Sequence, residues 1–149
     1  MANKLVLLVE DNPDDEALTL RALKASKVNG EVKVVRDGVE ALDYLFAAGA
    51  YAGRDIAEMP AVILLDLNLP KIDGLEVLRR VRADPRTELL CVVVFTSSGE
   101  ESDIQRAYGL RANSFIRKPV AFESFADTVQ HLSQYWLRCN EPPVSLLGS

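Results

Sequence analysis

The 149-residue sequence lacks the features that mark several large classes of protein. Cys91, Cys139 and the lone His131 have no spacing that would hold a metal, so we expect two reduced thiols and a surface histidine. No basic run is present and the net charge is -5, which disfavours nonspecific binding to nucleic acid. The apolar run at residues 5–9 is too short for a signal-peptide core or a membrane span. These absences predict a cytoplasmic protein without a nucleic-acid or membrane partner.

The sequence does contain a regular alternation of short apolar runs and helical patterns, at a length that suits one domain. The apolar runs are rich in β-branched residues, which is typical of parallel strands buried on both faces. Five strand–helix repeats predict an α/β fold built on an open, doubly wound sheet. The predicted strands cover residues 4–9, 31–35, 61–65, 91–95 and 113–116, and the predicted helices cover residues 14–25, 38–48, 75–81, 99–110 and 122–137.

Polar residues stand where the predicted strands end, which is where ligands bind in sheets of this kind. Glu10 and Asp11 follow the first strand, and Asp66, with Asn68 two positions later, follows the third. Thr96 and Ser98 follow the fourth strand, and Lys118 follows the fifth. We therefore expect three carboxylates, a hydroxyl and an ammonium group to converge on one edge of the sheet.

Three carboxylates gathered in this way repel one another, so the arrangement does not serve stability. Mg²⁺ offsets such repulsion and favours a few carboxylates together with water and phosphate oxygens. Lys118 supplies a positive charge for a phosphoryl group, and Thr96 supplies a hydrogen bond. Taken singly, Asp66 could be a turn former, Thr96 a helix cap and Lys118 a solvated lysine. The conjunction favours a phosphoryl-transfer site with Asp66 as the nucleophile.

The sequence resembles the receiver domains of two-component response regulators, of the chemotaxis type. The resemblance is carried by LLVEDN at 7–12, LLDLNLPKIDG at 64–74, FTSS at 95–98 and the pair Lys118-Pro119, and it spans residues 4 to about 137. It implies a flavodoxin-like (βα)5 fold with strand order 2-1-3-4-5, and Asp66 as the phosphoacceptor. It also implies a metal site made of Asp11, Asp66, the main-chain carbonyl of Asn68 and, partly through water, Glu10. Mg²⁺ is the expected ion, with Mn²⁺ as a substitute, and the Lys118-Pro119 bond is expected to be cis.

The resemblance further implies a switch and a way to tune it. Thr96 would move toward the phosphoryl group and Phe115 would turn inward behind it, by packing alone because phenylalanine has no hydroxyl. Asn68 and Ser98 would tune the lifetime of the phosphoryl group. The group would come from a sensor histidine kinase and would be lost slowly by autodephosphorylation, so the chain is not expected to be an enzyme in the usual sense.

A narrower resemblance is to stand-alone receivers that are paired with bacterial and cyanobacterial phytochrome kinases. It is carried by LDLNLP at 65–70, by QYWL at 134–137 and by the long segment at 49–60. Connections in such folds usually have 2–6 residues, so this segment predicts an elaborated loop.

The predicted receiver domain at residues 4–137 leaves only a tail at 138–149, with no output domain. The signal is therefore expected to leave through an effector protein, a phosphoryl relay or a change of association. In the last helix, a stripe of apolar residues is expected to face the core: Phe122, Phe125, Val129, Leu132 and Trp136. Large aromatic residues are enriched in interfaces, so a homodimer through Phe122, Tyr135 and Trp136, with the tail as an arm, is a further prediction.

Three other functions compete with the receiver as interpretations of the sequence. A haloacid-dehalogenase-type phosphatase also uses Asp and Mg²⁺ at a strand end, but it needs an acid where Asn68 stands. A flavodoxin-like FMN binder needs a phosphate loop after the first strand, where Glu10 and Asp11 would repel phosphate. A degenerate receiver is disfavoured because every expected group is present.

Overall fold

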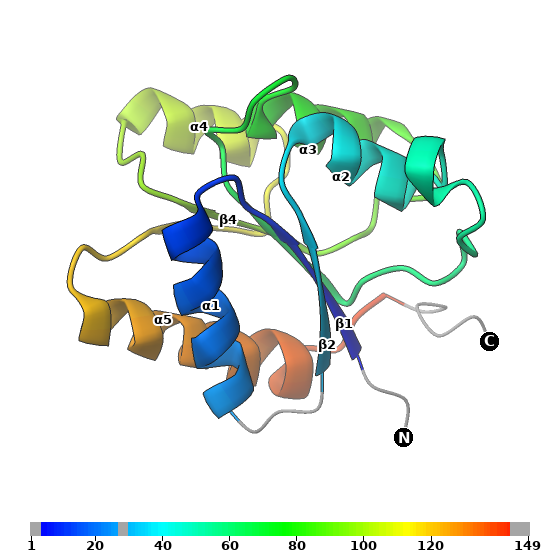
Figure 1. Ribbon diagram of the computed structural model, residues 1–149. Helices are drawn as coiled ribbons and strands as arrows, with labels where there is room; N and C mark the ends of the chain where they lie inside the picture. The colour runs from blue at the N-terminus through cyan, green and yellow to red at the C-terminus, as the bar shows by residue number, and fades with distance from the viewer. Residues whose placement is uncertain (1–3, 27–29, 144–149) are drawn as a thin grey trace.

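Five parallel strands form one sheet in the order β2-β1-β3-β4-β5, which confirms the predicted topology (Figure 1). The computed structural model describes residues 4–26 and 30–143. The strands are β1 (Lys4–Val9), β2 (Gly30–Val35), β3 (Val62–Leu65), β4 (Val92–Thr96) and β5 (Ser114–Arg117). The order reverses between β1 and β3, so the carboxyl ends of these two strands flank the topological switch point.

Helices cover both faces of the sheet, with α1 and α5 side by side on one face and α2, α3 and α4 on the other (Figure 1). Their bounds are α1 (Pro13–Ala25), α2 (Gly38–Leu45), α3 (Gly74–Ala83), α4 (Glu101–Gly109) and α5 (Phe122–Gln134). The predicted elaborated loop holds a short 3₁₀ turn, η1 (Gly49–Tyr51). Asn12, Asp37 and Asp73 cap α1, α2 and α3 by accepting hydrogen bonds from backbone N–H groups of the first turn.

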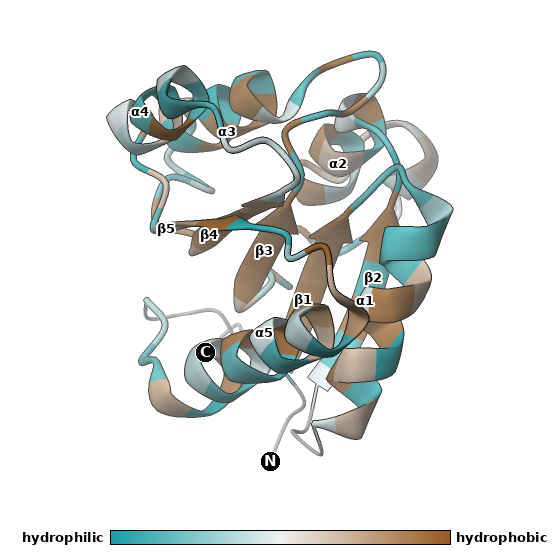
Figure 2. Cartoon of the chain, turned by 90° about the vertical axis from the view of Figure 1, so that its left-hand side faces the viewer, coloured by the Kyte–Doolittle hydropathy of each residue, from teal (hydrophilic) through white to brown (hydrophobic). Residues whose placement is uncertain are grey.

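The core lies in two layers, one on each face of the sheet, and the strands between them are apolar (Figure 2). Every residue of β3 and β4 is buried, because both faces of these central strands are covered by helices. Successive residues of a strand point to opposite faces, so Leu7 packs toward α2 and α3 while Leu8 packs toward α1 and α5. Cys91 is buried and His131 is exposed, as predicted.

Two predictions about the end of the chain differ from the structure. The last α-helix stops at Gln134, and Tyr135–Cys139 form a π-helical turn, η2, closed by the Asn140 N–H donating to the Tyr135 carbonyl at 2.7 Å. Phe122 is 53% exposed and is wrong as a core residue, because the buried stripe of α5 begins one turn later at Phe125. Residues 138–143 of the predicted tail are described, and residues 144–149 lie outside the described residues.

The peptide bond between Lys118 and Pro119 is trans, so the predicted cis bond is wrong. A trans bond is the lower-energy form even before proline, and the connection to α5 accommodates it with Val120 fully exposed.

Among the described residues, none of the helices combines the length and the apolar character that a membrane span requires.

Candidate functional site

Asp66 follows β3 and is only 6% exposed, although it is charged. Its N–H donates to the Val9 carbonyl of the neighbouring strand at 3.1 Å, which continues the sheet one residue past β3. Gly74 begins α3 directly against this turn, where a Cβ atom would meet the Asp66 carbonyl and the Leu67 backbone. The glycine therefore lets α3 close over the turn that carries Asp66.

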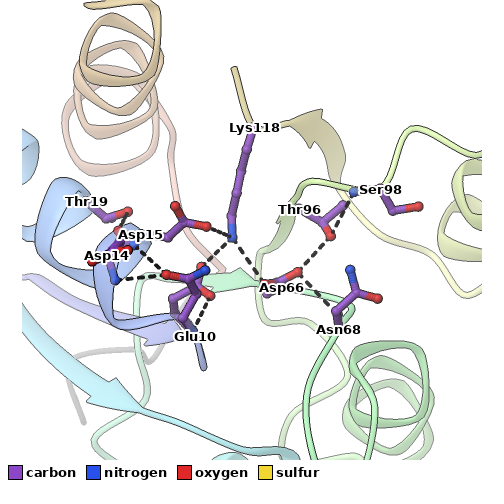
Figure 3. Close-up of polar contacts among 10 residues, drawn as sticks. Glu10, Asp14, Asp15, Thr19, Asp66, Asn68, Thr96, Ser98 and Lys118 are labelled. Atoms are coloured by element: carbon purple, nitrogen blue, oxygen red, sulfur yellow. Dashed lines mark hydrogen bonds and ion pairs between the residues drawn. The ribbon is translucent and has the colours of Figure 1, made fainter. Parts of the chain in front are cut away.

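The carboxylate of Asp66 is held by side chains from the end of β4 and from just beyond β5 (Figure 3). Its Oδ1 accepts a hydrogen bond from Thr96 Oγ1 at 2.7 Å and another from the Asn68 N–H at 3.2 Å. Its Oδ2 accepts from Lys118 Nζ at 3.1 Å. Thr96 is completely buried at the end of β4, so its hydroxyl is fixed where it meets Asp66.

Lys118 lies at the centre of the site, with its side chain 4% exposed. Its Nζ donates to Glu10 Oε1 at 2.6 Å, to Asp15 Oδ2 at 2.8 Å and to Asp66 Oδ2 at 3.1 Å. An ammonium group has three N–H donors, and here each one meets a different carboxylate. The structure thus brings together four predicted residues, Glu10, Asp66, Thr96 and Lys118.

Asp15 was missed by the sequence analysis, although its carboxylate is part of this cluster (Figure 3). It lies in the first turn of α1, where Pro13 takes the first position and the Asn12 side chain accepts hydrogen bonds from the N–H groups of Asp14 and Asp15. The only signal in the sequence is an acid in a helical first turn, where acids are common because they favour the helix dipole. Nothing in that pattern points to Lys118, which is 103 residues away.

Burial and charge act in opposite directions on the two most deeply placed groups. Burial alone would lower the pKa of Lys118, but the carboxylates of Asp15, Glu10 and Asp66 outweigh it and raise that pKa above its ordinary value. Glu10 is 1% exposed, and burial raises its pKa to about 7 in spite of the hydrogen bond and charge of Lys118. Lys118 is therefore a permanent cation, while Glu10 can exchange a proton near neutral pH.

Oxygen donors from carboxylates suit a hard divalent cation, so Glu10 and Asp66 fit the predicted metal. In the described residues, however, no three acids, histidines or cysteines are arranged to hold a metal ion as they stand. Asp11 is exposed, the Asn68 side chain is exposed, and the Lys118 ammonium lies between Glu10 and Asp66. The oxygens of Glu10 and Asp66 fit a divalent cation, but Lys118 must give up its contacts with them before the cation can bind.

The predicted switch and tuning residues surround this centre. Phe115 is half-buried in β5 and packs against the core beneath α4, and its backbone N–H donates to the Tyr108 hydroxyl at 3.2 Å. Ser98 lies at the mouth of the site, with its N–H near Thr96 Oγ1 at 3.4 Å and its hydroxyl 2.6 Å from Asp103 Oδ2 at the start of α4. The loop after β4 is thus connected to both Asp66 and α4.

The three aromatic residues predicted to form a dimer interface lie on two different surfaces. Tyr135 and Trp136 pack edge to face, with ring centroids 5.0 Å apart, and line a shallow groove between α5 and β5. Phe122 lines another groove between α1 and the start of α5. Phe122 and Tyr135 stand 13 positions apart, or roughly 20 Å along a helix, so they do not share one patch.

Comparison with known proteins gives one consistent answer. The profile of the response regulator receiver domain family matches residues 6–130. The probable methanogenesis regulatory protein FilR2 of Methanothrix harundinacea is 40% identical over 139 residues, which cover 93% of this chain and 87% of that protein. The Mn²⁺-bound response regulator Rcp1, a protein of Synechocystis, has a similar structure at 36% identity, with a TM-score of 0.88 and coverage of 95% and 99%. The phosphorylated cyanobacterial phytochrome response regulator RcpA is 42% identical, with a TM-score of 0.89 and the same coverage.

Proposed function

The chain belongs to the response regulator receiver domain family, and on that premise we propose that it is a signalling switch that accepts a phosphoryl group on Asp66. The observation that carries this proposal is the carboxylate of Asp66, buried at a strand end and held between Thr96 Oγ1 and Lys118 Nζ. Two relatives support it, since one solved structure is of a phosphorylated protein and another of a Mn²⁺-bound one.

Each residue of the cluster has a part in the transfer. An Asp66 oxygen attacks the phosphorus of a phosphohistidine, the new O–P bond forms, and the N–P bond breaks with its electrons returning to the imidazole. Lys118 and Thr96, which hold the two oxygens of Asp66, are placed to contact the oxygens of the incoming group instead. In hydrolysis, the oxygen of a water molecule attacks the phosphorus and the bond to Asp66 breaks with its electrons returning to the carboxylate. The phosphoryl group leaves as inorganic phosphate, which keeps the protons of the water or passes one to solvent.

Asp11, Asp66, Glu10 and the Asn68 carbonyl are the proposed holders of a divalent cation, Mg²⁺ in the cell and Mn²⁺ as a substitute. When bound, the ion would neutralise the charge on the transferred phosphoryl oxygens. Asn68 and Ser98 flank the approach to Asp66, so they are the residues proposed to govern how fast water reaches the phosphoryl group. The chain is then expected to catalyse only its own phosphorylation and its own slow dephosphorylation.

Incubation with acetyl phosphate and Mg²⁺, read by intact mass, tests the proposal. We expect one added phosphoryl group in the wild type and none in Asp66→Asn or in EDTA. Asp73→Asn is a matched control, because it removes an acid that caps α3 nearby but touches neither Thr96 nor Lys118. A phosphoryl group that persists in Asp66→Asn would reject Asp66 as the acceptor. Lys118→Ala should still bind Mg²⁺, but Thr96 and Phe115 should no longer move inward when Asp66 is phosphorylated.

A sensor histidine kinase is the proposed donor, and the likeness to RcpA favours a kinase of the phytochrome type in the cytoplasm. Mixing the chain with such a kinase carrying labelled phosphohistidine should move the label to the chain within the dead time of manual sampling. An unrelated histidine kinase is the control, and equal transfer from both would argue against the phytochrome pairing. The downstream partner is proposed to be an effector or a phosphotransfer protein.

A homodimer through the end of α5 is the proposed state of association. Tyr135 is 52% exposed beside the half-buried Trp136, next to the edge strand β5. Sedimentation should show that Tyr135→Asp weakens the dimer. Phe122→Asp, on the other surface, should leave the sedimenting mass equal to that of the wild-type dimer. A monomeric wild type, or a loss in the Phe122 variant alone, would contradict this assignment.

A further inference from the structure

Asp15 is the carboxylate beside Lys118 that the proposed metal site does not use. Its side chain is 22% exposed, against 2% for Glu10 and 8% for Asp66, so it lies at the rim of the cluster. We propose that Asp15 is a positioning residue that keeps hold of Lys118 when a divalent cation takes Glu10 and Asp66, and so sets the affinity of the site for that cation. The inference rests on the proposed function.

The ammonium group of Lys118 has three N–H donors. Each N–H of the ammonium has a carboxylate partner, at 2.6 Å for Glu10, 2.8 Å for Asp15 and 3.1 Å for Asp66. A divalent cation needs oxygens of Glu10 and Asp66, so its arrival removes two of these partners and places a second cation close to Lys118. A buried ammonium left without a carboxylate is unfavourable. Asp15 is the partner that remains, which lowers the cost of releasing the two metal ligands.

The position of Asp15 is fixed by the start of α1 rather than by Lys118. Its N–H donates to the Asn12 side chain at 3.1 Å, and its carbonyl accepts from the Thr19 hydroxyl at 2.7 Å. The carboxylate therefore stays at the rim when the contacts of Lys118 change. Figure 3 shows Asp15 reaching toward Lys118 Nζ from this turn. Asp14 lies on the same turn, and its N–H also donates to the Asn12 side chain. If Asp15 acted only through its negative charge, Asp14 would affect the affinity for the cation equally.

Calorimetric titration with Mg²⁺, without any phosphodonor, tests the inference on the full chain. Asp15→Asn should weaken Mg²⁺ binding about fivefold or more, a typical coupling between two sites. Asp14→Asn removes the same charge from the same turn and should change the affinity less than about twofold, because its exposed charge is screened. Lys118→Met should bind Mg²⁺ more tightly than the wild type, since the competing ammonium is gone.

The double variant Asp15→Asn/Lys118→Met decides whether Asp15 acts through Lys118. We expect it to bind Mg²⁺ as tightly as Lys118→Met alone. An undiminished loss in the double variant, or equal losses in Asp14→Asn and Asp15→Asn, would overturn the inference and leave phosphorylation of Asp66 untouched. Failure of the wild type to bind Mg²⁺ would overturn the proposed function and this inference with it. Urea unfolding of each variant shows that the folded protein is being titrated, and Asp15→Ser should reproduce Asp15→Asn.

Discussion

Lys118 and Arg82 are both buried cations, and their surroundings differ in kind. They lie at opposite ends of the strands, which are called here the Lys118 edge and the Arg82 edge of the sheet. Lys118 meets three carboxylates beyond the carboxyl ends of the strands. Arg82 is 8% exposed near the start of β4 and β5 and, among the residues that the structure describes, it meets no carboxylate and donates to neutral oxygens instead. These are the Glu88 and Leu90 carbonyls at 2.9 and 2.6 Å, the Arg111 carbonyl at 3.0 and 2.8 Å, and Asn113 Oδ1 at 2.9 Å.

The difference separates a structural cation from a functional one. The partners of Arg82 are neutral oxygens in two connections, so its guanidinium joins the end of α3 to the segments before β4 and β5. Burial, followed by the nearby charge of Arg111, lowers the pKa of Arg82 from its ordinary value, whereas the carboxylates raise that of Lys118. On the proposed function, a metal ion competes with Lys118 for its carboxylates, whereas nothing in that proposal competes with Arg82 for its partners. We therefore expect rearrangement at the Lys118 edge and none at the Arg82 edge.

The largest expected effect is on stability at the Arg82 edge. Arg82→Met leaves several buried carbonyls without donors, and we expect a loss of about 3 kcal/mol in the free energy of unfolding. Urea unfolding, in EDTA and again in saturating Mg²⁺, should give the same loss both times, because no metal replaces the guanidinium.

Lys118→Met is the matched variant at the other edge. It should also be destabilised in EDTA, because Glu10 and Asp66 lose their cation, and Mg²⁺ should restore stability by binding the folded state. A loss at Arg82 that Mg²⁺ repairs, or a loss at Lys118 that Mg²⁺ leaves unchanged, would break the comparison between the two edges.

The next effect is the pH dependence that only the Lys118 edge should have. The pKa of Glu10 rises from 4.5 to about 7 on folding, so between these values the folded chain binds more protons than the unfolded one. In EDTA, this carboxyl therefore stabilises the fold fully below pH 4.5, and its contribution falls by about 3 kcal/mol as the pH rises through 7. Urea unfolding across this range should show a smaller fall for Glu10→Gln than for the wild type. An identical slope in both proteins would show that Glu10 titrates as an ordinary carboxyl.

The sequence predicted the residues around Lys118 better than those around Arg82. The reason is that the first group can be identified from short-range sequence patterns and the second cannot. Thr96 ends a strand and Asp66 and Lys118 each directly follow one, and parallel strands bring their carboxyl ends to one edge of the sheet whatever the side-chain packing. Arg82 lies inside a helical pattern, where an arginine normally points to solvent. Its burial depends on loops 6 to 31 positions later in the chain, which no local pattern encodes.

One omission from the predicted site and two wrong predictions have related reasons. Asp15 joins the site through the angle at which α1 leaves β1, and that angle is a property of packing against α5. Phe122 has the right spacing for the buried stripe of its helix, but the helix begins beyond the edge of the core at that point. The bond before Pro119 was expected to be cis from a family resemblance, and no residue pattern in this chain required it.

The smallest expected effect compares two helix caps, one that leads to Lys118 and one that does not. Asn12→Ala and Asp73→Ala each remove a side chain that caps a helix, at α1 and α3, and each should cost about 1 kcal/mol in the free energy of unfolding. Asn12 also fixes the turn that carries Asp15, so its loss should weaken Mg²⁺ binding as Asp15→Asn does, though by less. Asp73 holds only the Glu76 N–H, and its loss should leave the Mg²⁺ affinity unchanged. Urea unfolding and calorimetry on the same preparations separate the two quantities. Equal losses of Mg²⁺ affinity would mean that the site responds to general loosening of its helices and not to the position of Asp15.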